Sequence, residues 1–289
     1  MIPRPFAYER PPTVEEAVAL LAEAGEREIK VLAGGQSLVP MMSLGLARPE
    51  LVVDVGELEL GGLERANGHV RVGALTTHRT LELGEEARSL LPLAATAARH
   101  VGNARVRNRG TLGGSLAHAD PAAELGAVVL AHGGFAVARG PDGERRIRVE
   151  DLFLGPLTTS LAPEELLVAV ELCVPEAGSG VGFEEAANRA DDFATAAAGA
   201  IVTLTDDGRS CASARIALAG TGPRPVRVRA AEELVRGEPL ASTLLAAVGR
   251  AAEAAVEAGD TAFVSAAFRR RVAGACARRA FERAWRSAR

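Results

Sequence analysis

Two glycine-rich segments are the strongest candidates for a ligand site. They are Ala33-Gly-Gly-Gln-Ser37 and Thr111-Leu-Gly-Gly-Ser115, and the first contains Gln36, the only glutamine of the chain. Paired glycines permit positive φ and let the main chain approach a ligand, and Ser and Thr hydroxyls add donors. We expect two turns with free main-chain N–H groups that bind an anion such as a pyrophosphate. The alternative is two ordinary turns at strand ends.

Other reactive side chains do not form a recognisable catalytic centre. Ser115 lacks the second glycine of a nucleophile elbow, and no carboxylate and histidine are spaced to argue for a triad. The dinucleotide fingerprint Gly-x-Gly-x-x-Gly is absent, and the only lysine, Lys30, is not part of a phosphate loop. His118 and Asp120 lack a third metal ligand, so polar lining of a groove, or a helix cap for Asp120, is the preferred interpretation. We therefore predict no catalytic residue and no metal site.

Composition and charge exclude several further classes of protein. The three cysteines, Cys173, Cys211 and Cys276, are far apart, so any iron–sulfur cluster must lie on another chain. The net charge of −4 among 289 residues argues against general nucleic-acid binding. Residues 1–12 lack the apolar core of a signal peptide, and no stretch is apolar enough for a membrane span. We expect a cytoplasmic protein.

Arg105, Arg107 and Arg109 form a local basic cluster within the polar segment 102–110. We expect this segment to be extended, because it shows no helical periodicity. Alternation would then place all three side chains on one side, where they meet a partner's carboxylates, nearby acidic side chains or nucleic acid. Nucleic acid is the weakest of these, since no neighbouring aromatic residue can stack on a base.

The elements around the first glycine segment are predicted with little ambiguity. Thr13-Val-Glu-Glu16 is a capping box, followed by helical apolar spacing that ends before Gly25. Ile29–Ala33 and Leu51–Asp54 are predicted strands, and residues 38–44 form a short apolar segment. These elements together predict a small α+β unit.

A second unit and a third follow along the chain. In the second we expect a helix capped by Thr76 or Thr77 and a helix that begins at Asp120-Pro121. Its other predicted elements are a strand at Val70–Ala74, a helix at Leu93–Ala98, a hairpin of Phe135–Ala138 and Arg145–Val149, and a strand at Leu166–Val174. Pro175–Gly180 is the best linker. Beyond it we predict a hairpin of Ala194–Thr205 and Ala212–Ala219, then helices at Thr243–Ala258 and Ser265–Trp285.

Two longer motifs give the sequence a specific resemblance. They are Val31-Leu-Ala-Gly-Gly-Gln-Ser-Leu-Val-Pro-Met-Met42 and Val106-Arg-Asn-Arg-Gly-Thr-Leu-Gly-Gly-Ser-Leu-Ala-His-Ala-Asp-Pro-Ala-Ala-Glu-Leu125. Their order and spacing resemble the FAD-binding medium subunit of the molybdenum hydroxylases, of the carbon monoxide dehydrogenase and xanthine dehydrogenase type. The resemblance implies an α+β fold. A two-part FAD-binding domain of the vanillyl-alcohol-oxidase type, residues 1–176 with parts 1–56 and 57–176, precedes a C-terminal domain of antiparallel strands and helices, residues 177–289.

The resemblance also implies where FAD is bound. The first segment would hold the FAD diphosphate through main-chain N–H groups and the Ser37 hydroxyl, and the second would close over the diphosphate and ribityl region. Glu124 stands where relatives often have Asp. The expected cofactor-binding residues are Ala33, Gly34, Gly35, Gln36, Ser37, Leu38, Val101, Thr111, Gly113, Gly114, Ser115, His118, Asp120, Glu124, Glu185 and Phe193.

The residues expected beside the flavin ring include a departure from the family pattern. Phe193 corresponds to the residue that lies against the ring, although it could equally be a core residue. Relatives often have Lys about eight residues earlier, where this chain has Glu184 and Glu185. A carboxylate there would disfavour an anionic reduced flavin. The direction of electron flow stays open.

The function implied is that of an electron-transfer flavoprotein subunit. Its partners would be an iron–sulfur small subunit and a molybdenum-cofactor large subunit, in a dimer of heterotrimers. Two alternatives are a free-standing FAD-dependent oxidoreductase and a non-catalytic module that binds an acidic partner through the arginine segment. Flavin in the purified protein excludes the module, and co-purification with two other chains excludes the free-standing enzyme.

Overall fold

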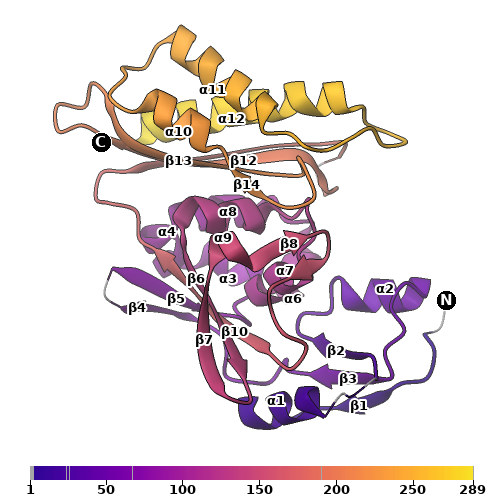
Figure 1. Cartoon of the computed structure of the whole chain (residues 1–289). Helices are drawn as coiled ribbons and strands as arrows, with labels where there is room; N and C mark the ends of the chain where they lie inside the picture. The colour runs from indigo at the N-terminus through magenta and orange to yellow at the C-terminus, as the bar shows by residue number, and fades with distance from the viewer. Residues whose placement is uncertain (1–2, 24, 26, 67, 190, 289) are drawn as a thin grey trace.

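The N-terminal unit is a small α+β lobe. The structure, a computed structural model, describes residues 3–23, 25, 27–66, 68–189 and 191–288. A three-stranded parallel sheet has the order β1 (Ala7–Glu9), β3 (Leu51–Asp54), β2 (Ile29–Leu32), and it carries helices α1 (Val14–Ala22) and α2 (Leu38–Leu44). Thr13 caps α1 by accepting a hydrogen bond from the Glu16 N–H, as its sequence predicts. In Figure 1 this lobe stands to one side of the remainder of the molecule.

The second unit is built on an antiparallel sheet. Its strand order is β4 (Leu63–Ala66), β5 (His69–Gly73), β10 (Leu166–Cys173), β6 (Gly134–Gly140), β7 (Gly143–Arg148). The predicted hairpin and the predicted strand at 166–174 are β6, β7 and β10. The remaining elements are α3 (His78–Leu83), α4 (Glu85–Leu90), α5 (Pro92–Ala98), α6 (Ala104–Arg109), α7 (Leu112–His118), α8 (Glu124–His132), α9 (Val149–Leu152), β8 (Phe153–Gly155) and β9 (Thr158–Thr159).

The C-terminal domain is an antiparallel sheet with helices on one face. The sheet has the order β11 (Gly180–Ala187), β12 (Ala194–Leu204), β13 (Cys211–Ala219), β14 (Val226–Arg227), and α10 (Arg229–Val235), α11 (Ser242–Ala254) and α12 (Ala266–Ser287) cover it. Small residues let α12 lie very close to β11. A Cβ on Gly182 would stand 2.0 Å from the Ala280 carbonyl oxygen. The α+β class with a C-terminal antiparallel domain is therefore as the sequence predicts.

Helix α8 joins the second unit to the C-terminal domain. Every residue of α8 is buried, and all of them except the terminal Glu124 and His132 are apolar or glycine, as expected of a helix in the core. It packs against α5 of its own unit and against β12 and β13 of the C-terminal sheet (Figure 1). Phe183, Ala197 and Ala217 of that sheet belong to the same apolar cluster as Leu125 and Val129 of α8. One apolar cluster therefore spans the boundary between the two domains, and a second cluster lies between the C-terminal sheet and its helices.

Three local predictions are wrong. Residues 104–109 form helix α6 rather than an extended segment; Asn103 caps it, and none of its residues is buried, so no periodicity marks it. The second glycine segment is not a turn but the start of α7, with Thr111 as cap. Asp120 does not start a helix, because its carboxylate accepts a hydrogen bond from Ala122 in a turn and α8 begins at Glu124.

Several short elements were not predicted from the sequence. The strands β1 and β4 are three and four residues long and mostly exposed, so they carry little apolar patterning. Of the two candidate caps, Thr77 caps α3, whereas Thr76 donates its hydroxyl to the Gly62 carbonyl. Within the described residues, no helix is both long and apolar enough to cross a membrane.

Candidate functional site

The fold brings the two glycine segments into direct contact. The first follows β2 and leads into α2, and the second follows α6. A Cβ on Gly34 would stand 2.0 Å from the Arg109 carbonyl oxygen and 2.9 Å from the Gly110 Cα atom. A Cβ built on Gly114 would lie 3.8 Å from the Ala33 Cβ. Segments about eighty residues apart in the sequence therefore form one surface.

The first segment has the unused donors expected of an anion cradle. Among the described residues, the main-chain N–H groups of Gln36, Ser37 and Leu38 donate to no acceptor, and the Ser37 hydroxyl does not cap α2. Gly35 has φ +75°, a conformation that favours glycine and that turns the chain here. The Gln36 amide donates to the Gly34 carbonyl and holds the turn. These N–H groups are available to a ligand.

The second segment has no comparable set of free N–H groups, contrary to our prediction. Leu112 donates to the Thr76 carbonyl, Gly113 to the Ala74 carbonyl, and Gly114 to the Thr111 hydroxyl. A Cβ on Gly113 would lie 2.5 Å from the Ala74 Cβ. This glycine is required because α7 packs directly on the end of β5. The second glycine segment thus packs within the protein and does not provide a second set of free N–H donors.

The arginine cluster is divided by the fold. Arg107 is largely buried and donates to the Glu82 carboxylate at 2.9 Å and to the carbonyls of Val101 and Gly102. Arg105 and Arg109 remain exposed. Positions two apart in a helix do not share a face, so the expected row of three cations is wrong. Only two of the three are available to a partner.

A buried pair of carboxyl groups lies beyond the C-terminal end of α7. Glu124 is the first residue of α8 and is 6% exposed, and the Glu185 side chain, on β11, is 5% exposed. Burial and the negative charge of Asp120 raise the pKa of Glu124 to about 7. Burial and the charge of Glu124 raise the pKa of Glu185 to about 8. At neutral pH, Glu185 is therefore mostly protonated.

Neighbouring residues assign different roles to the two adjacent glutamates of β11. The Glu184 carboxylate forms an ion pair with Arg283 of α12. A Glu185 carboxyl oxygen lies 3.7 Å from the His100 Nδ1 atom, and the His100 ring packs against Phe183 at a tilted angle of 56°. Burial lowers the pKa of His100, so the imidazole is neutral and gives Glu185 no opposite charge. Glu184 thus pairs with α12 inside the C-terminal domain, whereas Glu185 faces Glu124 and His100 of the second unit.

Replacing Glu185 should change how stability depends on pH. A raised carboxyl pKa means that the folded chain holds a proton that the unfolded chain releases, so its contribution is complete below about pH 4.5 and is lost as pH rises to about 8. Glu185→Gln should melt several degrees above wild type at about pH 9 and close to it at about pH 5. Calorimetry of both proteins measures the difference. Glu233→Gln, at an exposed glutamate of α10, is the control; equal curves for Glu185→Gln and wild type would refute the buried-acid assignment.

The other expected site residues occupy different environments. Val101 is half-buried and packs on the main core, and His118 is half-buried in the last turn of α7. Phe193 precedes β12 and is 67% exposed, so the alternative that it is a core residue is wrong. Ser115 is half-buried in α7. The described residues contain no group of three or more His, Cys, Asp or Glu side chains that could hold a metal ion.

Two histidines near the site were not identified from the sequence. His78, the first residue of α3, is buried, and a Cβ on Gly110 would lie 2.8 Å from its Nε2 atom. Burial, with the charge of Arg107, lowers the pKa of His78 to about 4. His100 contacts Glu185. Neither belongs to a motif, and only the tertiary fold shows what they contact.

Comparisons with known proteins identify the two domains. Residues 4–175 match the FAD binding domain in molybdopterin dehydrogenase, and residues 182–284 match the CO dehydrogenase flavoprotein C-terminal domain. The chain belongs to the FAD-binding medium subunits of the molybdenum hydroxylases. This medium subunit is thus a component of an oxidoreductase complex of several subunits, with an electron-transfer role that its family defines.

Relatives align over almost the whole medium subunit. It is 37% identical over 273 residues to the 6-hydroxypseudooxynicotine dehydrogenase complex subunit alpha of Paenarthrobacter nicotinovorans, covering 94% of this chain and 92% of the relative. It is 34% identical to the carbon monoxide dehydrogenase medium chain of Hydrogenophaga pseudoflava, covering 99% of both. A solved carbon monoxide dehydrogenase structure from the latter organism superposes with a TM-score of 0.96 over 100% of both chains, at 34% identity.

Proposed function

We propose that the medium subunit holds the FAD diphosphate on the N–H groups of Gln36, Ser37 and Leu38. The observation that carries this proposal is that these donors have no acceptor within the described residues while Gly34 packs on Arg109 and Gly110. Main-chain N–H groups satisfy phosphate oxygens without a side-chain cation. The Ser37 hydroxyl adds a donor. The chain's residues therefore fit the cofactor that the family requires.

The carboxyl pair and Phe193 would lie at the flavin-ring end of this site. Helix α7 has seven residues and is about 10 Å long. It would lead from the diphosphate end of the site to the flavin-ring end. FAD, when bound, supplies the redox chemistry, and the chain's residues position it and set its surroundings. The proton on Glu185 changes our expectation of a repulsive carboxylate, because a neutral carboxyl donates a hydrogen bond and does not repel negative charge.

Replacing Phe193 tests where the flavin ring lies. Because its side chain is 67% exposed, Phe193→Ala should shift the melting temperature by less than about 2 °C. The visible spectrum and reduction potential of the bound flavin should change, since an aromatic contact is removed. Phe263→Ala, at a 96% exposed site in the C-terminal domain, should change neither. A loss of several kcal/mol with an unchanged flavin would assign Phe193 to packing instead.

We infer that electrons reach the flavin from clusters on an iron–sulfur small subunit, supplied by a molybdenum cofactor on a large subunit, in a dimer of heterotrimers. Arg105 and Arg109 are exposed beside Gly110, at the contact between the glycine segments, and guanidinium groups suit a partner's carboxylates. These two exposed arginines support a partner surface near the diphosphate end of the site. The cytoplasmic location stays a prediction.

The free-standing oxidoreductase and the binding module have less support. The chain covers 99% of a carbon monoxide dehydrogenase medium chain, and several relatives are named as subunits of dehydrogenases. Relatives take their names from carbon monoxide, caffeine and a nicotine derivative. We therefore propose the role in the complex without a particular substrate.

A further inference from the structure

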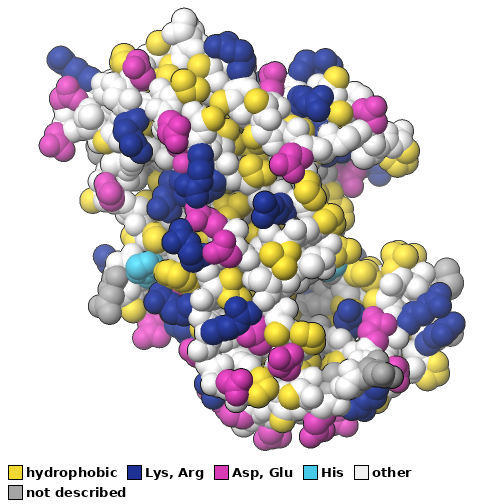
Figure 2. Space-filling model, viewed as in Figure 1, with side chains coloured by type: hydrophobic (Ala, Val, Ile, Leu, Met, Phe, Trp, Pro, Cys, Tyr) yellow, Lys and Arg dark blue, Asp and Glu magenta, His cyan; other side chains and the backbone are white. Residues whose placement is uncertain are grey.

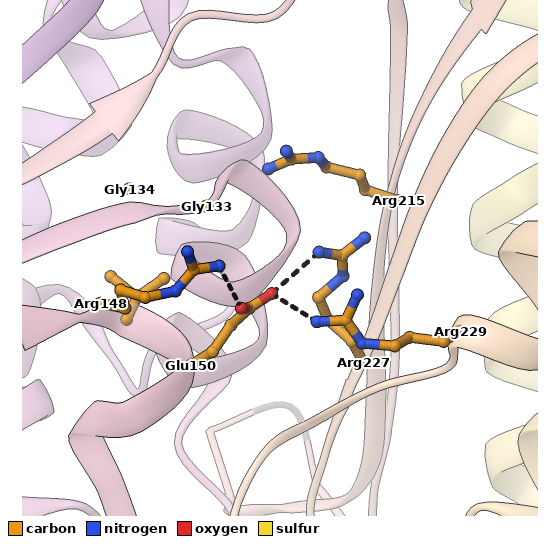
Figure 3. A pocket seen from close by; sticks show the side chains of 8 residues that line it. Gly133, Gly134, Arg148, Glu150, Arg215, Arg227 and Arg229 are labelled. Atoms are coloured by element: carbon orange, nitrogen blue, oxygen red, sulfur yellow. Dashed lines mark hydrogen bonds and ion pairs between the residues drawn. The ribbon is translucent and has the colours of Figure 1, made fainter.

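A cavity lined by arginines lies where the second unit meets the C-terminal domain. Its volume is about 130 Å³, and Gly133, Gly134, Val149 and the side chains of five charged residues line it (Figure 3). The charged residues are Arg148, Glu150, Arg215, Arg227 and Arg229. A single water molecule needs roughly 10–15 Å³. The cavity is thus large enough for an ion of several heavy atoms.

Glu150 is the only carboxylate of the lining, and three of the arginines contact it. Its oxygens lie 2.8 Å from Arg148, 3.0 Å from Arg227 and 2.9 Å from Arg229. Figure 3 shows Arg148 reaching it from one side and Arg227 and Arg229 from the other. These arginines hold the pKa of Glu150 below its ordinary value, so it is ionised. One carboxylate cannot use all the donors of three guanidinium groups.

Arg215 adds a fourth cation without an acidic partner. Among the described residues it forms no ion pair, and it donates a short hydrogen bond to the His132 carbonyl. Its guanidinium lies against Gly133, where a Cβ would stand 2.2 Å from Nη1. The position of Arg215 therefore depends on a missing side chain at Gly133, which has φ +71°.

The cluster keeps an excess of positive charge after its internal ion pairs are counted. Arg227 also pairs with Glu232, and the pKa of Arg148 is raised mainly by its hydrogen bond to Glu150 and slightly by Asp151. The four guanidinium groups thus face three carboxylates, those of Glu150, Glu232 and Asp151. Of these carboxylates, only that of Glu150 lines the cavity. His132 contributes no charge, because burial lowers its pKa to about 4. If this cluster only joined the two domains through ion pairs, it would need neither Arg215 nor the cavity.

We propose that this cavity binds a small oxyanion, phosphate or the terminal phosphate of a nucleotide, opposite Glu150. Arg148, Arg215 and Arg229 each use one guanidinium nitrogen in a hydrogen bond within the protein, which leaves N–H donors that match the oxygens of a phosphate group. Arg227 instead donates to Glu232 and Glu150 and holds the cluster in place. The side chains of Arg148 and Arg229 are 64% and 62% exposed, so the site is reached from solvent. Figure 2 shows Lys and Arg side chains gathered on this face, at the level where the domains meet. The site is separate from the glycine segments and does not depend on their proposed role.

Calorimetric titration of the FAD-loaded chain with inorganic phosphate tests the site. Ionic strength is kept constant with chloride, because charge screening alone changes affinity. We expect one phosphate per chain for wild type and for Arg250→Gln, which replaces an exposed arginine of α11. Arg148→Gln and Arg215→Gln should each weaken binding about tenfold or more. Arg148 is exposed, so its variant reports on the site even if Arg215→Gln destabilises the chain. Glu150→Gln should bind phosphate more tightly than wild type.

A second arm distinguishes the source of the oxyanion. ADP that binds at least about tenfold more tightly than phosphate identifies a nucleotide, and equal affinity identifies free phosphate. Either result supports the site, provided that Arg148→Gln weakens the binding of that ligand. Equal phosphate affinity in wild type and all variants would overturn the proposal. The absence of phosphate binding to wild type would also overturn it, and weaker assembly of Arg148→Gln with its partner subunits would then show that the cluster receives an acidic protein surface.

Discussion

Purified Gly35→Val medium subunit should contain no flavin. The φ of +75° at Gly35 costs a β-branched residue roughly 1–3 kcal/mol, and a new side chain would press on Leu32 and Val39, each 3.3 Å from the Cβ position. The segment must move, and the N–H groups that follow Gly35 move with it. Hydrogen bonds to charged groups contribute about 1.5–3 kcal/mol each, so the loss of two should weaken FAD binding by about 100-fold or more. Flavin absorbance per polypeptide measures the loss.

The control for Gly35→Val is a glycine with the same backbone requirement elsewhere. Gly237 has φ +81° with nothing within 4 Å of its Cβ position, so Gly237→Val carries similar strain far from the glycine segments. It should keep its flavin. Circular dichroism should show that the C-terminal domain of Gly35→Val is folded. If Gly35→Val retains stoichiometric FAD, the diphosphate does not lie on this segment.

The FAD-loaded medium subunit alone should show no substrate-dependent flavin reduction. The described residues hold no candidate metal cluster, and burial raises the pKa of both Cys211 and Cys276 to about 11, which leaves them unreactive thiols. Adding the two proposed partner subunits should restore turnover to an ordinary enzymatic range of about 1–10³ s⁻¹. Flavin bleaching in a stopped-flow instrument follows the electrons.

The design of this second experiment avoids the need to know the substrate. The isolated iron–sulfur subunit is reduced chemically and mixed with the oxidised medium subunit, and the flavin should bleach. Partner subunits mixed with Gly35→Val should give no turnover. Native mass spectrometry of the restored assembly reports its subunit composition. Rapid flavin reduction by substrate in the medium subunit alone would establish a free-standing enzyme.

The parts of the fold that could be predicted carry their own local signals. A few neighbouring residues are enough to predict the helix capped by Thr13, the apolar strand at Leu51–Asp54 and the long helix near the C-terminus. Helix α6 could not be predicted, because it buries no residue. Its stability comes from a cap at Asn103 and from the contacts of Arg107 with Glu82 and two carbonyls.

The sequence predicted which segments form the candidate site, but the structure gives some of their glycines a different role. The sequence indicated that both double glycines free the main chain for a ligand. In the structure, Gly34 and Gly113 are required by contact with protein main chain and with Ala74, and only the segment that contains Gly35 keeps unused donors. The raised pKa values of Glu124 and Glu185 could not be predicted either, because these residues are 61 positions apart and meet only across the domain interface.

The complete burial of α8 has a consequence for how the chain can be divided. This helix belongs to the FAD-binding domain by sequence, yet β12 and β13 of the C-terminal domain cover part of its surface. A fragment that ended at the linker would expose this apolar surface to water, and such exposed patches lead to aggregation. The boundary between the two family domains is thus not a boundary between folding units. We therefore expect the N-terminal half to reach its full stability only after β12 and β13 have been synthesised and have covered α8.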